Sequence, residues 1–275
     1  DMGPSALRVA NINTRLHSLG YNVDDLGNVP VEQQESSRVG LAKARYLKSI
    51  AATCAALAQR VEKAVSQGKF PLVLGGDHSI GYPCARGVAE CIEGNVGIIH
   101  LDRHVDTQEK DMDEIMHTCP WFHATNLPNC PPKNLVQIGI GGWQVPRPGV
   151  KHGRTMECTV LTVQDVEKLG IAKTVEIALE VAWKGASAVY LSFDIDSVDA
   201  GFVPGTGWPE PGGLLPREAL AILRGVANEG VAALEVVEVS PPYDISDITA
   251  LLGVRAIVDV LASMVKHGRI GGRLA

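Results

Sequence analysis

The chain has 275 residues, is 45% hydrophobic and carries a formal net charge of -6. We expect one domain over residues 1–275, because this length fits one α/β domain and no Ser/Gly-rich or Pro-rich linker interrupts it. The acidic balance argues against nucleic-acid binding. No apolar stretch is expected to reach the length of a membrane span. Six cysteines without CxxC spacing, and no signal peptide, favour a cytoplasmic protein with reduced thiols.

Apolar runs with the character of strands alternate along the chain with stretches that have helical periodicity. The expected elements are helix 41–67, strand 70–74, helix 79–93, strand 96–101, strand 135–140, strand 159–162, a helix from 163, helix 175–185, strand 188–193, helix 216–229, strand 232–239 and helix 247–267. Residues 107–133 show little periodicity, and a first strand is expected to precede residue 1. This alternation predicts an α/β fold, with a mostly parallel sheet covered by helices on both faces.

Three short groups of histidine and aspartate follow three of the expected strands. The groups are His78 after strand 70–74, the set Asp102, His104 and Asp106 after strand 96–101, and the pair Asp194 and Asp196 after strand 188–193. Parallel sheets place their sites at the carboxyl ends of strands. Residues at i, i+2 and i+4 share one face of a strand, so each set converges if the extended backbone continues. Taken alone, a histidine such as His78 is more often a helix cap or a hydrogen-bonded turn residue. A pair such as Asp194 and Asp196 is more often the solvated end of a strand. Three groups together favour a metal centre.

The chemistry of these side chains indicates which metals suit them. Two imidazoles and four carboxylates fit two divalent cations such as manganese, nickel, cobalt or zinc. The absence of cysteine from the groups argues against a structural zinc site. Two cations a few ångströms apart lower the pKa of water and hold an electrophile beside it. The residues therefore predict a hydrolase.

The same motifs resemble the metal-binding signatures of the ureohydrolases, the family of arginase and agmatinase. The signatures read Gly75-Gly-Asp-His-Ser79, Asp102-x-His-x-Asp106 and Ser192-Phe-Asp-Ile-Asp-Ser197, followed by a Pro/Gly-rich loop at 198–214 and a late strand at 235–241. The resemblance implies an arginase-like three-layer α/β fold, a dinuclear site and hydrolysis of a guanidino group to urea. It also implies a homo-oligomer, either a trimer or a hexamer.

The resemblance also implies a role for each site residue. It assigns His78, Asp102, Asp106 and Asp194 to one cation, and Asp102, His104, Asp194 and Asp196 to the other, the cations being Ni2+ or Mn2+. A hydroxide between them would attack the guanidinium carbon, with Asp196 accepting its hydrogen bond and then a proton. Glu238 would pair with guanidinium nitrogens, since a carboxylate suits that planar fork; the alternative is a salt-bridged acid at a strand end.

Other residues around these motifs have two interpretations each. His117 lies where arginases keep a proton-shuttling histidine, and the alternative is a histidine on a surface loop. Asp77 is expected to orient a ligand. Asp199 either does the same or caps a turn.

Departures from the usual signatures carry information about the substrate. Arg103 replaces the small residue of the second signature, and Trp208 replaces the threonine of a Thr-Gly-Thr-Pro loop. Trp121 and Phe122 lie in an aromatic segment that lacks the residues with which arginases hold arginine. We expect these three rings to wall the pocket and stack on a flat cation, the alternative being that they pack a core or a subunit interface.

These variants, with Gly141-Gly-Trp-Gln144, resemble the guanidine hydrolase branch, which favours nickel, whereas the opening at 1–27 is more similar to arginase. We therefore expect hydrolysis of a small guanidine to urea and ammonia or an amine. Free guanidine is the first choice, and a methylated guanidine or biguanide is next. Agmatine, arginine or a guanidino acid is the alternative within the class. A catalytically silent metal-binding partner subunit is the alternative outside it, although the complete set of six ligands argues against that.

Overall fold

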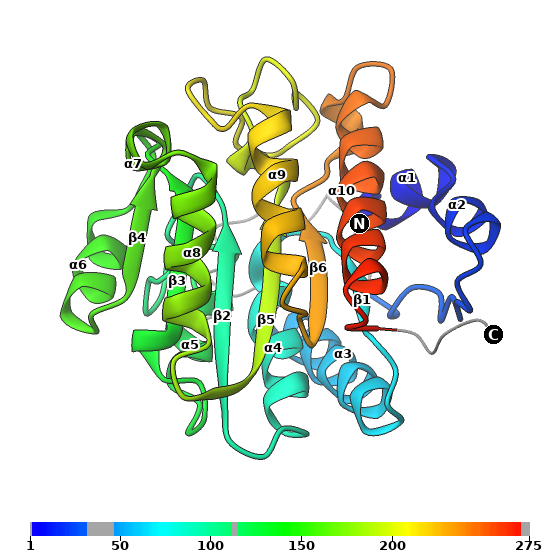
Figure 1. The fold of residues 1–275 in the computed structure, drawn as a ribbon, viewed down its shortest axis with the longest axis horizontal. Coiled ribbons are helices and arrows are strands. Elements are labelled where there is room, and N and C mark those ends of the chain that lie inside the picture. Colours follow the sequence, from blue (N-terminus) through cyan, green and yellow to red (C-terminus); the bar gives the residue numbers. More distant parts are fainter. Residues whose placement is uncertain (1, 32–46, 112–114, 271–275) are drawn as a thin grey trace.

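The computed structural model describes residues 2–31, 47–111 and 115–270. Within these ranges, six parallel strands form one sheet in the order β1-β6-β5-β2-β3-β4 (Figure 1). The strands are β1 Leu72–Leu74, β2 Asn95–Leu101, β3 Leu135–Ile140, β4 Thr159–Thr162, β5 Ala186–Asp194 and β6 Ala233–Val237. Each lies within two residues of its predicted position.

Helices cover both faces of the sheet, which confirms the predicted three-layer α/β fold (Figure 1). One face carries α8 Ile171–Ala182, α9 Pro216–Ala227 and α10 Ile248–Lys266, and the other carries α3 Leu47–Ser66, α4 Gly81–Ala89 and α5 Pro120–Ala124. Ile99 and Leu191 belong to the first core, whereas the adjacent Ile98 and Tyr190 belong to the second. Alternate residues of a strand point to opposite faces, so one sheet supplies both cores.

Several short helices were absent from the sequence prediction. They are α1 Gly3–Val9, α2 Ile12–Ser18, α5 and α6 Arg147–Thr155. The helix predicted for 79–93 divides into a 3-10 turn, His78–Ile80, and the shorter α4. The predicted residues 41–46 of the helix that becomes α3 lie outside the described ranges. Helices of five to nine residues offer fewer than three turns of periodicity, which explains why the pattern missed them.

Helix α10 corrects the expectation about membrane-span length. Its 19 residues are long and apolar enough to cross a membrane by length and composition, with a hydropathy of 1.9, so the expectation was wrong for this helix. Its apolar character has another explanation, because 56% of its most apolar stretch is buried inside the protein. Val254, Ile257 and Val260 are at most 2% exposed in the core beside α9. The helix is a core element of this layer.

The order of the strands decides where the site lies. β1, β6, β5 and β2 are neighbours, and all four run parallel. Their carboxyl ends therefore meet at one edge of the sheet, although the segments that follow them are far apart in sequence. β2 also borders β3, so the chain extends the sheet in both directions from this strand. Such a reversal is the usual place for a site in an open α/β sheet.

Candidate metal centre

One half of the centre surrounds the ring of His78. Its Nδ1 lies 3.2 Å from Oδ2 of Asp102, 3.0 Å from Oδ2 of Asp106 and 3.1 Å from Oδ2 of Asp194. The side chain is 1% exposed, and this nitrogen has no hydrogen-bond partner among the described residues. A buried, unpaired nitrogen facing three carboxylate oxygens is an arrangement that a bound cation completes.

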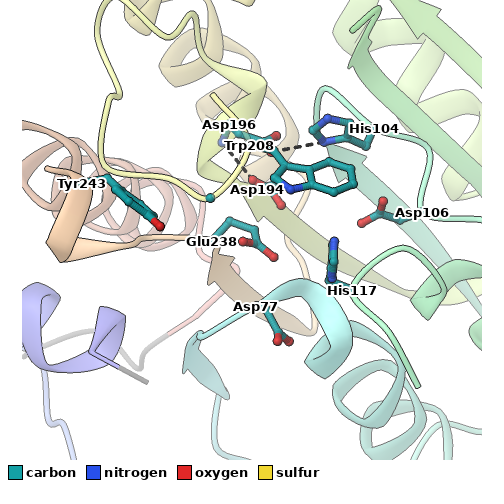
Figure 2. A pocket seen from close by; sticks show the side chains of 10 residues that line it. Asp77, His104, Asp106, His117, Asp194, Asp196, Trp208, Glu238 and Tyr243 are labelled. Atoms are coloured by element: carbon teal, nitrogen blue, oxygen red, sulfur yellow. Dashed lines mark hydrogen bonds and ion pairs between the residues drawn. The ribbon is translucent and has the colours of Figure 1, made fainter. Parts of the chain in front are cut away.

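The other half surrounds His104, and Asp102 joins the two. Nδ1 of His104 lies 3.3 Å from Oδ1 of Asp102. The same nitrogen lies 3.2 Å from Oδ2 of Asp196 (Figure 2). Asp102 therefore presents Oδ2 to one histidine and Oδ1 to the other, as a bridging carboxylate would. Backbone donors hold these groups, since the amides of Asp196 and Arg103 donate to Oδ1 of Asp194 at 2.8 Å and to Oδ1 of Asp196 at 3.3 Å.

Turns, rather than continued strands, bring these side chains together. β2 ends at Leu101, and Asp106 has a φ of 47°, in the left-handed region. After β5, the 3-10 turn Ile195–Ser197 rotates Asp196 toward the site. The expectation that extended backbone makes each set converge was therefore wrong in mechanism. A non-glycine residue with positive φ costs about 1 kcal/mol or more, and such strain is concentrated at functional sites.

The charges of the centre are consistent with two divalent cations. Four buried aspartates surround two imidazoles, so the cluster has an excess of negative charge. Burial and the neighbouring carboxylates raise the pKa of Asp194 well above its usual range and the pKa of Asp196 to about 6. Burial lowers the pKa of His104, but Asp102 and Asp196 outweigh it and raise that pKa to about 12. These shifts show that the cluster favours added positive charge, and two divalent cations would balance the four carboxylates.

His100 is a residue of the centre that the sequence analysis missed. Its ligand atom lies within 4.8 Å of those of His78, Asp102 and Asp106. The Gln137 amide lies 2.9 Å from Nδ1, which leaves Nε2 to donate to Oδ2 of Asp102 at 2.7 Å. His100 therefore orients the carboxylate shared by the two halves. Its spacing, two residues before Asp102 on a strand, was the available signal.

A cavity of about 240 Å3 opens beside these residues (Figure 2). It is lined by Asp77, His104, Asp106, His117, Asp194, Asp196, Gly207, Trp208, Glu238 and Tyr243. Glu238 follows β6 with a φ of 64°, and its Oε1 accepts a hydrogen bond from the backbone amide of His78 at 2.7 Å. Burial, together with the charges of Asp77 and Asp196, raises the pKa of Glu238 to about 8. Nearby cations would lower this pKa, because positive charge favours the carboxylate.

Of the three aromatic residues predicted to line the pocket, one lies on the cavity wall and two lie elsewhere. Trp208 is on the cavity wall, with its ring centroid 5.4 Å from His104 and 5.2 Å from His117. Trp121 is instead fully buried against the rings of His78 and His100. Phe122 packs on His152, with ring centroids 4.5 Å apart. The cavity lining includes neither Trp121 nor Phe122, so the expectation that both form the pocket wall was wrong. Helix α5 instead directs Trp121 into the core and Phe122 against His152.

The remaining predicted residues support the loops around the cavity. Arg103 is 3% exposed, and its guanidinium points away from the centre to the carbonyl oxygens of Gly139 at 3.2 Å and Pro211 at 3.3 Å. Asp199 accepts hydrogen bonds from the amides of Gly201 and Gly212, so it caps the loop. Asp77 caps the turn that carries His78 by accepting from the amide of Ser79 at 3.1 Å.

Comparison with known proteins defines the class to which this site belongs. The arginase family model matches residues 1–263, and the chain belongs to this family, whose members are hydrolases of amidine carbon–nitrogen bonds. Its similarity extends to human mitochondrial guanidino acid hydrolase, which is 37% identical over 218 residues. That match covers 78% of this chain but only 60% of the human relative.

Arginases and agmatinases are also similar to this chain over most of its length. Chicken mitochondrial agmatinase is 35% identical over 94% of this chain and 74% of its own. The solved structure of arginase from Bacillus caldovelox superimposes with a TM-score of 0.85 at 30% identity, over 100% of this chain and 93% of that one. The fold and the ureohydrolase resemblance are thereby confirmed.

Proposed function

We propose that this chain is a binuclear-metal amidinohydrolase that converts a small guanidine compound to urea and ammonia or an amine. The residues that would hold two Mn2+ or Ni2+ ions are His78, Asp102, His104, Asp106, Asp194 and Asp196. When bound, two divalent cations lower the pKa of water toward neutrality and so supply a nucleophile. The support is the convergence of the four aspartates on the Nδ1 atoms of the two histidines.

The charge of the cavity carries the proposed substrate class. Five of its ten lining residues are carboxylates, and none of these ten is lysine or arginine. A space of about 240 Å3 with this charge attracts a small cation such as guanidinium and repels a substrate carboxylate, for which these ten residues include no lysine or arginine. Free guanidine is therefore the first choice, followed by a methylated guanidine or a biguanide.

Three side chains around the cavity support this proposal. Oε1 of Glu238 is occupied by the amide of His78, which leaves Oε2 to accept a guanidinium N–H. Asp196 lies at the junction of the cavity and the cluster, where its carboxylate can accept a proton from the attacking water. His117, on the cavity wall beside Trp208, can deliver a proton to the departing nitrogen.

Relatives give weight to a second group of substrates. The names of the human and chicken relatives specify a guanidino acid hydrolase and an agmatinase, and the Bacillus caldovelox relative is an arginase. Agmatine fits the cavity charge better than arginine or a guanidino acid, because agmatine has no carboxylate. A catalytically silent metal-binding subunit is the remaining alternative.

We also propose a cytoplasmic homo-oligomer, a trimer or hexamer, that acts without nucleic acid or membrane. The net charge of -6 disfavours a nucleic-acid partner. Trp143 is 78% exposed, and aromatic side chains are enriched at subunit interfaces relative to the rest of the surface. Size-exclusion chromatography with light scattering measures the subunit number, and a monomer would contradict this part.

Urea release tests the proposed activity. The metal-free protein is reloaded separately with Mn2+ and Ni2+, and offered guanidine, methylguanidine, dimethylguanidine, metformin, agmatine, arginine and 4-guanidinobutyrate. Preference for guanidine or methylguanidine supports the small, acidic cavity as the determinant of specificity. Preference for a long substrate moves the assignment to the second group, and no urea from any compound favours the silent subunit.

A further inference from the structure

Both histidines of the proposed metal centre have a buried glutamate at the ring nitrogen that faces away from the cluster. Oε1 of Glu235 lies 3.6 Å from Nε2 of His78, and Oε1 of Glu210 lies 3.5 Å from Nε2 of His104. The two glutamates are 0% and 1% exposed. In each case Nδ1 faces the aspartates and Nε2 faces the glutamate, although the four residues come from four separate segments.

The carboxylate of Glu210 is held by backbone amides of the loop at 141–144. Its Oε2 accepts from the amide of Trp143 at 2.9 Å, and its Oε1 accepts from the amide of Gln144 at 3.2 Å. A Cβ at Gly142 would overlap the Glu210 carboxylate, so only glycine admits it there. These contacts fix the carboxylate behind His104, whose Nε2 has no hydrogen-bond partner among the described residues.

Glu235 is held in the sheet rather than in a loop. It is the acidic residue within β6, a strand otherwise made of alanine, leucine and valine. Its partner in register on β5 is Ser192, whose Oγ lies 2.9 Å from Nε2 of His78. A Cβ at Gly81 would lie 3.2 Å from Oε1, so this carboxylate also reaches its histidine across a glycine. Neither of its oxygens has a hydrogen-bond partner among the described residues.

We propose that Glu210, and Glu235 together with the hydroxyl of Ser192, are positioning residues that keep the proton of each imidazole on Nε2, so that the Nδ1 lone pair faces the cations. A neutral imidazole carries one proton, and the group beside one nitrogen decides which nitrogen has it. A carboxylate there also restrains the ring and strengthens it as a ligand, and the loss of such a partner weakens metal binding by about 10- to 100-fold. The inference rests on the proposed metal centre.

The test measures metal binding directly, by calorimetric titration of the metal-free protein with Mn2+ and by counting bound metal. The unmodified chain is expected to bind two ions. Glu210→Gln and Glu235→Gln retain the shape of each side chain but remove its charge. Each variant is expected to bind one of the two ions about 10- to 100-fold more weakly, with little change at the other site.

Two further variants test whether the position of the Glu210 carboxylate matters and whether removing an unrelated charge has any effect. Gly142→Ala keeps Glu210 but displaces its carboxylate. Binding of the ion held by His104 is therefore expected to weaken, as in Glu210→Gln. Glu229→Gln is the matched control, because it neutralises an exposed glutamate that pairs with Arg269. It is expected to leave both ions bound as in the unmodified chain.

Nitrogen-15 NMR of the unmodified chain loaded with Zn2+, which suits the same ligands and is diamagnetic, provides a readout that needs no variant to fold. It is expected to show His78 and His104 protonated at Nε2 and unprotonated at Nδ1, and a proton on either Nδ1 would overturn the inference. Two ions bound with unchanged affinity in Glu210→Gln and Glu235→Gln would also overturn it, leaving the proposed function intact. Failure of the unmodified chain to bind any metal would overturn both.

Discussion

The two histidines of the centre lie in different kinds of surroundings. His78 rests on the sheet and on the rings of His100 and Trp121, all of which are at most 1% exposed. His104 instead lies next to Trp208 and the loop that contains Glu210. Loops tolerate change better than packed cores and carry more of the specificity. We therefore expect the His78 half to contribute more to stability and the His104 half to contribute more to the choice of substrate.

Asp196→Asn, which changes a residue beside His104, should cause the largest loss of activity among these variants. The variant keeps the shape of the side chain but removes the proton acceptor, so turnover should fall by about 100-fold or more. Urea release at saturating substrate measures the loss, and circular dichroism checks that the fold is retained. Full activity in this variant would contradict the role of Asp196.

Trp121→Ala tests the stability role of the other half. Removing a fully buried tryptophan should lower the free energy of unfolding by about 3–5 kcal/mol. Trp208→Ala is the matched control, since removing its partly exposed ring should cost less than removing the fully buried ring of Trp121. Urea-induced unfolding of both variants measures the difference. Equal losses would remove the distinction between a core half and a loop half.

Trp208→Thr should change substrate preference more than stability. Its ring stands beside His104 and His117 on the cavity wall, so a smaller side chain enlarges the cavity. We expect kcat/KM for agmatine relative to guanidine to rise by about 10-fold, within the range that one pocket contact supplies. An unchanged ratio would show that specificity is determined elsewhere.

The final expected effect is a dependence of stability on pH in the metal-free protein. The pKa of Glu238 is raised from 4.5 to about 8, and that of Asp196 from 3.8 to about 6, in both cases chiefly by burial. The folded state therefore retains protons that the unfolded chain releases. The free energy of unfolding should thus fall as pH rises from about 4.5 to 8, with Tm falling by about 2–4 °C per kcal/mol lost.

Bound cations should reverse or flatten this dependence, because they favour the carboxylates. Thermal melts of the metal-free and Mn2+-loaded protein between pH 5 and 8 provide the comparison. If both forms melt alike at every pH, the excess negative charge is relieved by something other than metal.

Short-range patterns in the sequence were enough to locate most elements of this fold. Alternation between apolar runs and helical periodicity depends on which residues are buried, so all six strands were placed correctly. Periodicity failed for α1, α2, α5 and α6, because helices of five to nine residues contain few turns. The six proposed metal ligands stood out because they follow strands in tight groups with distinctive chemistry.

Contacts between distant segments required the tertiary structure. The sheet order places the end of β6 beside the ends of β1 and β5, which brings Glu235 and Glu238 to His78. Nothing near Glu210 in sequence indicates that it lies behind His104, and the burial of Trp121 depends on how α5 packs. The sequence by itself determined the elements and the chemistry at each strand end, because both are local. Which groups share a site was decided by tertiary packing, because chain segments more than 100 residues apart meet only when the sheet forms.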